Sequence, residues 1–182
     1  MRKVRLLGAA LLAAALVFPA GVGARELTDT EKASLAEAVT AFDAAMQEED
    51  IEGIIGVVPP KVFEHIATQN GLESEALMAS MIDQTTELMA TITFESFSMD
   101  MNAAAYKEAA DGTPYVLIPT ETVIDLGESG KIRAASDTLA MLDEGLWYLV
   151  RTDDASTLAI IKEIYPTYAA VEFPAGTMEP VE

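Results

Sequence analysis

The feature that most constrains this chain is a change in the spacing of its apolar residues close to Thr91. Before that point, apolar residues recur every three or four positions, which is the pattern of one face of an α-helix. After it, they alternate with polar residues, as on a strand with one buried face. The sequence therefore predicts helices followed by strands, which is the order of an α+β domain.

Three helices are expected before the change. The first spans 28–48 and begins with a capping box, in which the side chains of Thr28 and Glu31 bind free backbone N–H groups. The second spans 60–70 and opens at Pro60, a residue that suits the first position of a helix. A short apolar segment separates the two. These helices would supply apolar faces for a sheet to cover.

The third helix is expected to start at Ser74, which is predicted to be its N-cap. Its apolar residues form one broad stripe. The stripe consists of Leu77, Met78, Met81, Ile82, Leu88, Met89 and Ile92. A stripe of this width predicts a helix that packs against the rest of the domain.

Strands are expected around 97–101, 115–125, 131–142 and 146–151. Their short connections predict antiparallel pairing, because a parallel pair needs a much longer crossover. Pro119 interrupts the second strand and indicates a bulge or an edge position. A last helix is expected from Asp154 to Pro166. The prediction is an α+β fold with N-terminal helices in the concave face of a curved antiparallel sheet of about four strands, and a short C-terminal helix.

The N-terminus has the pattern of a cleavable signal peptide over 1–24. A basic cluster over 2–5 precedes an apolar run over 6–18, and small residues lead up to Ala24. The run is too short for a membrane span, which needs roughly 20 apolar residues. The alternative is a retained N-terminal helix. Cleavage predicts a periplasmic or secreted protein with no membrane anchor.

The rest of the chain is expected to form a single domain over 25–170, followed by an extended or mobile tail over 171–182. The full chain carries 30 acidic and 11 basic residues, for a net charge of −19. Such a charge disfavours binding to nucleic acid and to anionic membranes. The chain has no cysteine, which excludes disulfides, cysteine catalysis and a cysteine-linked lipid anchor.

The element order resembles that of the nuclear transport factor 2-like (cystatin-like) superfamily, and in particular its exported uncharacterised bacterial members. The aromatic pair Trp147-Tyr148 before Val150-Arg151, and the later Ile164-Tyr165-Pro166, carry the rest of the resemblance. The resemblance implies a cavity between helices and sheet that relatives use for small ligands, for isomerase or cyclase chemistry, or for protein partners. It also implies a homodimer through the exposed sheet face.

Four residues are candidates for a site in such a cavity. Glu121 shares a strand face with Tyr115, and partial burial there would favour its protonated form. With Tyr148, Glu121 would make an acid and hydrogen-bond donor pair. His65 is the only histidine and would suit proton transfer. The alternatives are that His65 lies on the solvated side of its helix and that the Glu121 face is the solvent side.

No metal or cofactor is expected. A single histidine without cysteine excludes histidine-rich zinc sites. Met99 and Met101 share a strand face, as soft copper ligands would, but helical spacing of the other methionines indicates core packing.

We therefore expect a non-catalytic binding or interaction domain, with a small apolar ligand or a protein as its partner. Tyr115, Glu121 and Tyr148 would line the ligand site. The first alternative is an isomerase or cyclase-type enzyme that uses a cavity acid, and the second is a structural accessory protein of the cell envelope that binds no small ligand.

Overall fold

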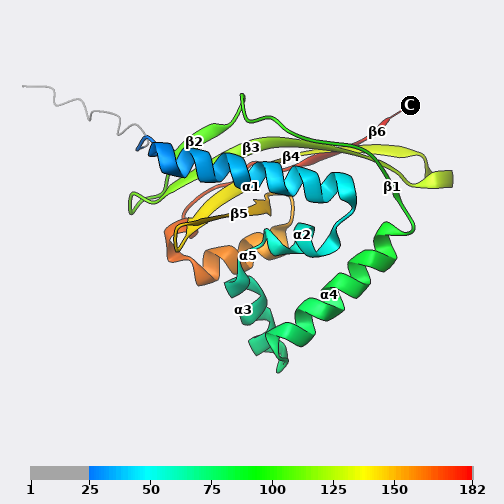
Figure 1. Ribbon diagram of the computed structural model, residues 1–182, viewed down its shortest axis with the longest axis horizontal. Coiled ribbons are helices and arrows are strands. Elements are labelled where there is room, and N and C mark those ends of the chain that lie inside the picture. Colours follow the sequence, from blue (N-terminus) through cyan, green and yellow to red (C-terminus); the bar gives the residue numbers. More distant parts are fainter. Residues whose placement is uncertain (1–24, 182) are drawn as a thin grey trace, which may run out of the picture.

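The computed structural model describes residues 25–181, which form helices packed against a strongly curved antiparallel sheet (Figure 1). The helices are α1 (Asp29–Glu48), α2 (Ile51–Gly56), α3 (Pro60–Asn70), α4 (Ser74–Met89) and α5 (Ala155–Ile164). The strands are β1 (Thr93–Met99), β2 (Ala105–Glu108), β3 (Pro114–Asp125), β4 (Lys131–Asp143), β5 (Leu146–Arg151) and β6 (Thr177–Val181). The signal peptide predicted over 1–24 lies outside the described residues.

The predicted α+β fold is confirmed. Four helices come first, and the strands β1, β3, β4 and β5 form one continuous antiparallel path. The short helix α5 follows the last strand of that path. Two strands are additional to the expected set: β2 pairs with β3, and β6, in the C-terminal segment, pairs with β4.

Helix α1 begins as the sequence predicts. The backbone N–H of Glu31 donates to Thr28 Oγ1 at 3.2 Å, and the backbone N–H of Thr28 donates to Glu31 Oε2 at 2.7 Å. Leu35, Val39 and Phe42 are buried on one side of the helix. The capping box therefore fixes the first turn of a helix whose apolar face enters the core.

Helix α4 differs from its prediction at its first residue. The N-cap is Glu73, with an extended backbone (φ −78°, ψ 141°) and no side-chain capping bond. The backbone N–H of Leu77 donates to the Glu73 carbonyl at 3.0 Å. The helical ladder thus already includes that carbonyl, and the prediction that Ser74 caps the helix is wrong.

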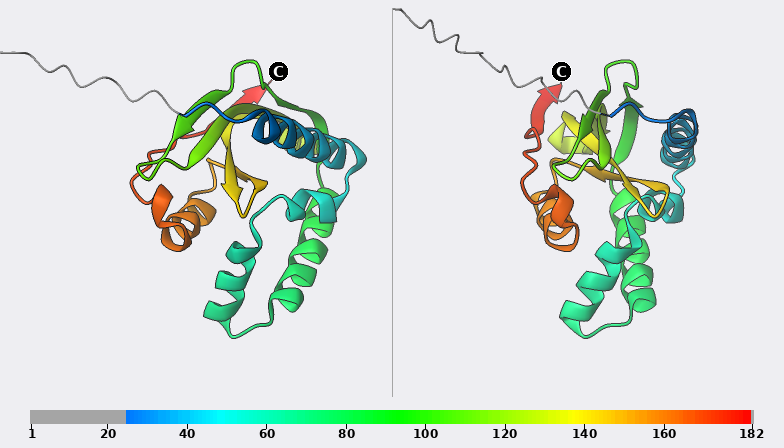
Figure 2. Two further views of the ribbon diagram at one scale, coloured as in Figure 1. Left: turned by 60° about the vertical axis from the view of Figure 1, so that its left-hand side comes forward. Right: turned by 90° about the vertical axis from the view of Figure 1, so that its left-hand side faces the viewer.

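Both faces of the central sheet are covered. One face packs on α1, and its buried side chains include Val116, Ile118, Ala140, Trp147 and Leu149. The other face packs on α5 and on the start of α3, and includes Tyr115, Leu117, Leu139, Met141 and Val150. Figure 2 shows α1 and α5 on opposite sides of the strands. Strands β3, β4 and β5 therefore form the middle layer of the molecule.

Pro119 lies on an inner strand and not at a bulge of β3, but it is unpaired on one side, so the expected edge position is met on that side only. β3 lies between β4 on one side and β1 and β2 on the other, and its register with β4 continues without a shift through Pro119. On the other side, β1 pairs up to Thr120 and β2 only from Leu117. Pro119 thus faces a break between two strands, where its missing N–H costs no ladder bond.

Candidate functional site

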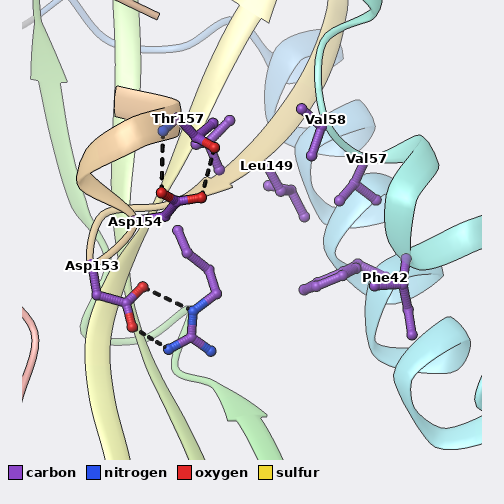
Figure 3. Close-up of a pocket in the computed structure, with 10 residues that line it drawn as sticks. Phe42, Val57, Val58, Leu149, Asp153, Asp154 and Thr157 are labelled. Atoms are coloured by element: carbon purple, nitrogen blue, oxygen red, sulfur yellow. Dashed lines mark hydrogen bonds and ion pairs between the residues drawn. The ribbon is translucent and has the colours of Figure 1, made fainter. Parts of the chain in front are cut away.

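A cleft with one apolar side and one charged side lies between α1, α2, β5 and the start of α5, and we call it the α2–β5 cleft. Its volume is about 410 Å³. Figure 3 shows its two sides: Phe42, Val57, Val58 and Leu149 on one, and Asp153, Asp154 and Thr157 on the other. Ile54, Val150 and Arg151 complete the lining.

Helix α2 forms one wall because its sequence allows it to lie close to α1. The Asp50 side chain caps α2 by accepting from the backbone N–H of Gly53 at 3.2 Å. A Cβ at Gly53 would lie 2.9 Å from the Cβ of Ala45, so only glycine permits this approach without a shift. At its other end, the Val57 carbonyl accepts from the backbone N–H of Leu149 at 2.7 Å. This bond joins the helix to the free edge of β5.

The charged side of the cleft is held by an arginine–carboxylate pair. Arg151 Nε and Nη2 donate to the two oxygens of Asp153 at 3.0 and 2.7 Å. The remaining donors of Arg151 reach Thr122 Oγ1 at 3.2 Å and Ser136 Oγ at 3.3 Å. The bond from Arg151 lowers the pKa of Asp153. Asp153 is therefore ionised at neutral pH and already fully engaged.

Asp154 is engaged in the same way, as the N-cap of α5. Its carboxylate accepts from the backbone N–H groups of Ser156 and Thr157 at 3.0 and 3.1 Å, and from both hydroxyls. Burial acts to raise the pKa of Asp154, but these hydrogen bonds outweigh it and the pKa is lowered. Both carboxylates of the cleft are thus ionised and hydrogen-bonded. Such groups give the cleft a negative rim but are poorly suited to accept a proton from a substrate.

Glu121 lies outside this cleft. It lines a separate shallow hollow on the sheet, together with Ser98, Asp100 and Asp137 among others. Its side chain is 47% exposed, and its Oε1 lies 3.5 Å from Arg133 Nε. The burial that would have favoured its protonated form is absent. Tyr115, on the same face of β3, is buried under α5, so this strand face is buried at one end and exposed at Glu121.

Tyr115 and Tyr148 are brought together, but not with Glu121. Both are in register with Met141 of β4, one on each side, so the three side chains form a row across the sheet. Glu121 lies six positions beyond Tyr115, a separation of about 20 Å along an extended strand. The postulated Glu121–Tyr148 acid and donor pair is therefore not assembled.

Tyr115 belongs to an aromatic cluster under α5. Its ring packs edge-on against Tyr168 at 5.9 Å, and Tyr168 packs against Tyr165 at 6.4 Å. The Tyr165 hydroxyl donates to Asp143 Oδ2 at 2.8 Å, and Asp143 also accepts from Lys61. The buried Tyr168 hydroxyl has no hydrogen-bond partner within residues 25–181. Burial raises the pKa of both Tyr165 and Tyr168, so these phenols stay neutral.

His65 is a residue of α3 whose side chain faces α5, and it does not line the cleft. Its Nε2 is 2.7 Å from Gln69 Nε2 and 3.6 Å from Glu163 Oε2. Met99 and Met101 pack against the α1 side of the core. The other methionines with helical spacing, Met78, Met81 and Met89, lie on α4, where no residue is buried, so the prediction that they fill the core is wrong. Across residues 25–181, no group of three or more histidine, aspartate or glutamate side chains is placed to hold a metal ion.

The residues that line the α2–β5 cleft were not predicted from the sequence as site residues. Phe42 belongs to the core as well as to the cleft, because it also packs edge-on against Phe97 at 5.4 Å. Arg151 and Asp153 carried a local signal, since opposite charges two residues apart followed a predicted strand. No local pattern indicated that α1, α2, β5 and α5 would meet to form this cleft.

Within residues 25–181, no helix combines the length and the apolar character needed to cross a membrane. Comparisons with protein-family models, with curated proteins and with solved structures gave no match to this chain.

Proposed function

We propose that this protein is an exported, non-catalytic binding domain that holds a small apolar ligand in the α2–β5 cleft. The observation that carries the proposal is the make-up of the cleft: one wall is apolar, and the charged groups opposite are already paired with each other or with the start of α5. A volume of about 410 Å³ falls within the roughly 300 to 1,000 Å³ typical of ligand sites. Export is supported by the signal-peptide pattern of the N-terminus.

The charges of the cleft and of the whole chain limit the class of ligand that can bind. Arg151 is neutralised by Asp153, and Asp154 adds a further negative charge. The whole chain is also strongly acidic. An anionic head group would be repelled, so the proposed ligand has an apolar body and a neutral or cationic head. The resemblance to the nuclear transport factor 2-like superfamily is part of this proposal, and the order of helices before a curved sheet supports it.

The first test is native mass spectrometry of the protein purified from its own extracytoplasmic fraction. We expect a retained small molecule of apolar character, released on denaturation. The second test uses N-phenyl-1-naphthylamine, a neutral apolar dye, with the anionic 1-anilinonaphthalene-8-sulfonate for comparison. We expect the neutral dye to bind more tightly than the anionic one.

A substitution that fills the cleft tests whether the dye binds there. Val57→Phe adds volume to the apolar wall and should weaken dye binding by about tenfold or more, because about 1.4 kcal/mol corresponds to a factor of ten. Leu146→Phe is the matched control, since Leu146 is 61% exposed on the β4–β5 hairpin and does not line the cleft. Equal dye binding by both variants at unchanged melting temperature would refute the cleft as the site.

A further inference from the structure

Helix α4 carries an apolar surface of six large side chains, of which five are half-buried and one is exposed within the described structure. We call it the α4 stripe, and it consists of Leu77, Met78, Met81, Ile82, Leu88 and Met89. None of the 16 residues of α4 is buried within the described structure, whereas α1 buries four. Leu88 is 59% exposed, and Leu72, in the turn before α4, is 50% exposed. None of these residues lines the α2–β5 cleft.

The geometry of the hairpin explains why the stripe remains partly exposed. Helices α3 and α4 pack against each other and project from the sheet (Figure 2). Helix α3 has 11 residues and α4 has 16, so the last turns of α4 extend past its partner. Phe63 and Ala67 of α3 are fully covered, and the short helix α2 also contacts α4. These two helices cover only part of the stripe.

Helix α4 has few stabilising features at its ends. Its N-cap makes no side-chain hydrogen bond, and its last turn has no basic residue. Helices in proteins owe most of their stability to packing of an apolar face. An α4 stripe covered by a partner would supply that packing.

The charges around the stripe select the partner. The sequence has no lysine or arginine from Val62 to Tyr106. Helical spacing sets Glu73 and Glu75 at the borders of the stripe, which we call its acidic rim, whereas Asp83 and Glu87 lie on the other side of α4. A second copy of this chain would bring two acidic rims together, and an anionic membrane would be repelled in the same way. A segment with basic residues beside an apolar face is complementary to both the stripe and its rim.

We propose that the α4 stripe is a docking surface for a basic amphipathic helix of a partner protein. An amphipathic helix laid in an apolar groove is a common mode of peptide recognition. Three of the six stripe residues contribute flexible side chains, Met78, Met81 and Met89, which adapt to the shape of a bound helix. This docking surface is separate from the ligand cleft, so either proposal can fail without the other.

The test uses a fluorescein-labelled leucine–lysine peptide of about 18 residues, long enough to form a helix when bound. Its leucines recur every three or four residues, and fluorescence anisotropy measures its binding to the protein. A second peptide has the same composition in scrambled order, and a third has glutamate in place of lysine. We expect the first peptide to bind at least about tenfold more tightly than either control, because only it matches both the stripe and the rim.

Variants locate the docking surface. Leu88→Gln and Met81→Gln should each weaken binding about tenfold, because each removes an apolar contact without changing charge. Leu88 is the safer site for folding because it is already exposed. Leu146→Gln, an exposed leucine on the β4–β5 hairpin, is the matched control and should bind as the parent protein does. Glu75→Gln should weaken binding less than the apolar variants and reduce its salt dependence.

Three outcomes would overturn the proposal. Equal binding of the ordered and scrambled peptides would mean general charge attraction alone. Unchanged affinity in both Leu88→Gln and Met81→Gln would place the peptide elsewhere. A dimer in native mass spectrometry that dissociates on Leu88→Gln would identify the occupant as a second copy of this chain.

Discussion

The middle of the sheet and the α3–α4 hairpin carry similar apolar residues, but the sheet buries them and the hairpin leaves them partly exposed. In β3, Val116 and Ile118 are completely buried, because α1 covers the sheet face on which both lie. In α4, an apolar stripe of comparable size remains half-covered, with Leu88 59% exposed. Apolar content alone therefore does not distinguish core from docking surface. What distinguishes them is how many neighbouring elements the chain folds over each one.

The largest expected difference between the two regions is in the cost of truncating an apolar side chain. Ile118→Ala should lower the free energy of unfolding by about 2 to 5 kcal/mol, because it leaves a cavity in a fully packed layer. Leu88→Ala, in α4, should change it by about 0.5 kcal/mol or less, as surface substitutions do. Urea unfolding of both variants measures this. Similar losses would mean that the α4 stripe is as well covered as the core.

A smaller effect is expected from two tyrosines of the aromatic cluster under α5. Tyr165→Phe removes a hydrogen bond to the Asp143 carboxylate and should cost about 1.5 to 3 kcal/mol. Tyr168→Phe removes a hydroxyl that is buried without a partner within residues 25–181, and should stabilise the protein by about 1 kcal/mol. Thermal and urea unfolding should therefore show changes in the free energy of unfolding of opposite sign for the two variants. A loss of stability in Tyr168→Phe would reveal a partner such as a buried water.

The N-caps extend the comparison to two helices: α1, which packs on the sheet, and α4 of the hairpin. Thr28→Ala removes the α1 capping box and should cost about 1 kcal/mol. Glu73→Ser offers α4 the side-chain cap that it lacks and should gain about 0.5 to 1 kcal/mol. Denaturant midpoints of the two variants should move in opposite directions. A destabilised Glu73→Ser protein would show that Glu73 has a role that the cap geometry does not reveal.

The smallest expected effect is on pH dependence. Hydrogen bonds from Arg25, and then from the Thr28 backbone, lower the pKa of Glu31 from 4.5 to about 2. A lowered pKa in the folded state contributes stability above pH 4.5 that is lost as the pH falls toward 2. The Glu31→Gln variant should therefore melt below the parent protein at neutral pH, and the difference should vanish near pH 2. The effect is small because the pair is exposed to solvent.

The sequence predicted most of the fold because spacing and end signals agree there. The capping box of α1, the proline that opens α3 and the short loop between β4 and β5 each act within a few residues, so local pattern was sufficient. β2 was missed because it is only four residues long. The way in which β3 accommodates Pro119 could not be predicted, because it depends on a break between two strands that pair with the far side of β3.

The candidate site was less predictable for a physical reason. The lining of the α2–β5 cleft comes from α1, α2, β5 and α5, and its apolar residues have the same spacing as core residues. The tyrosine and glutamate candidates were chosen by strand alternation, which indicates a shared face but not the distance along it. Tyr115 and Tyr148 do lie in one row, whereas Glu121 lies far along its strand and in solvent.

The break opposite Pro119 has a consequence for how this sheet meets other chains. Each side of the β3–β4 pair is flanked by two short strands set end to end, β1 with β2 on one side and β5 with β6 on the other. The longest of these four has seven residues, and β6 contains Pro180. Long, flat edges recruit further strands and lead to fibres, whereas short and proline-bearing edges do not. Interrupted borders thus protect a strand-rich protein against polymerisation at high concentration.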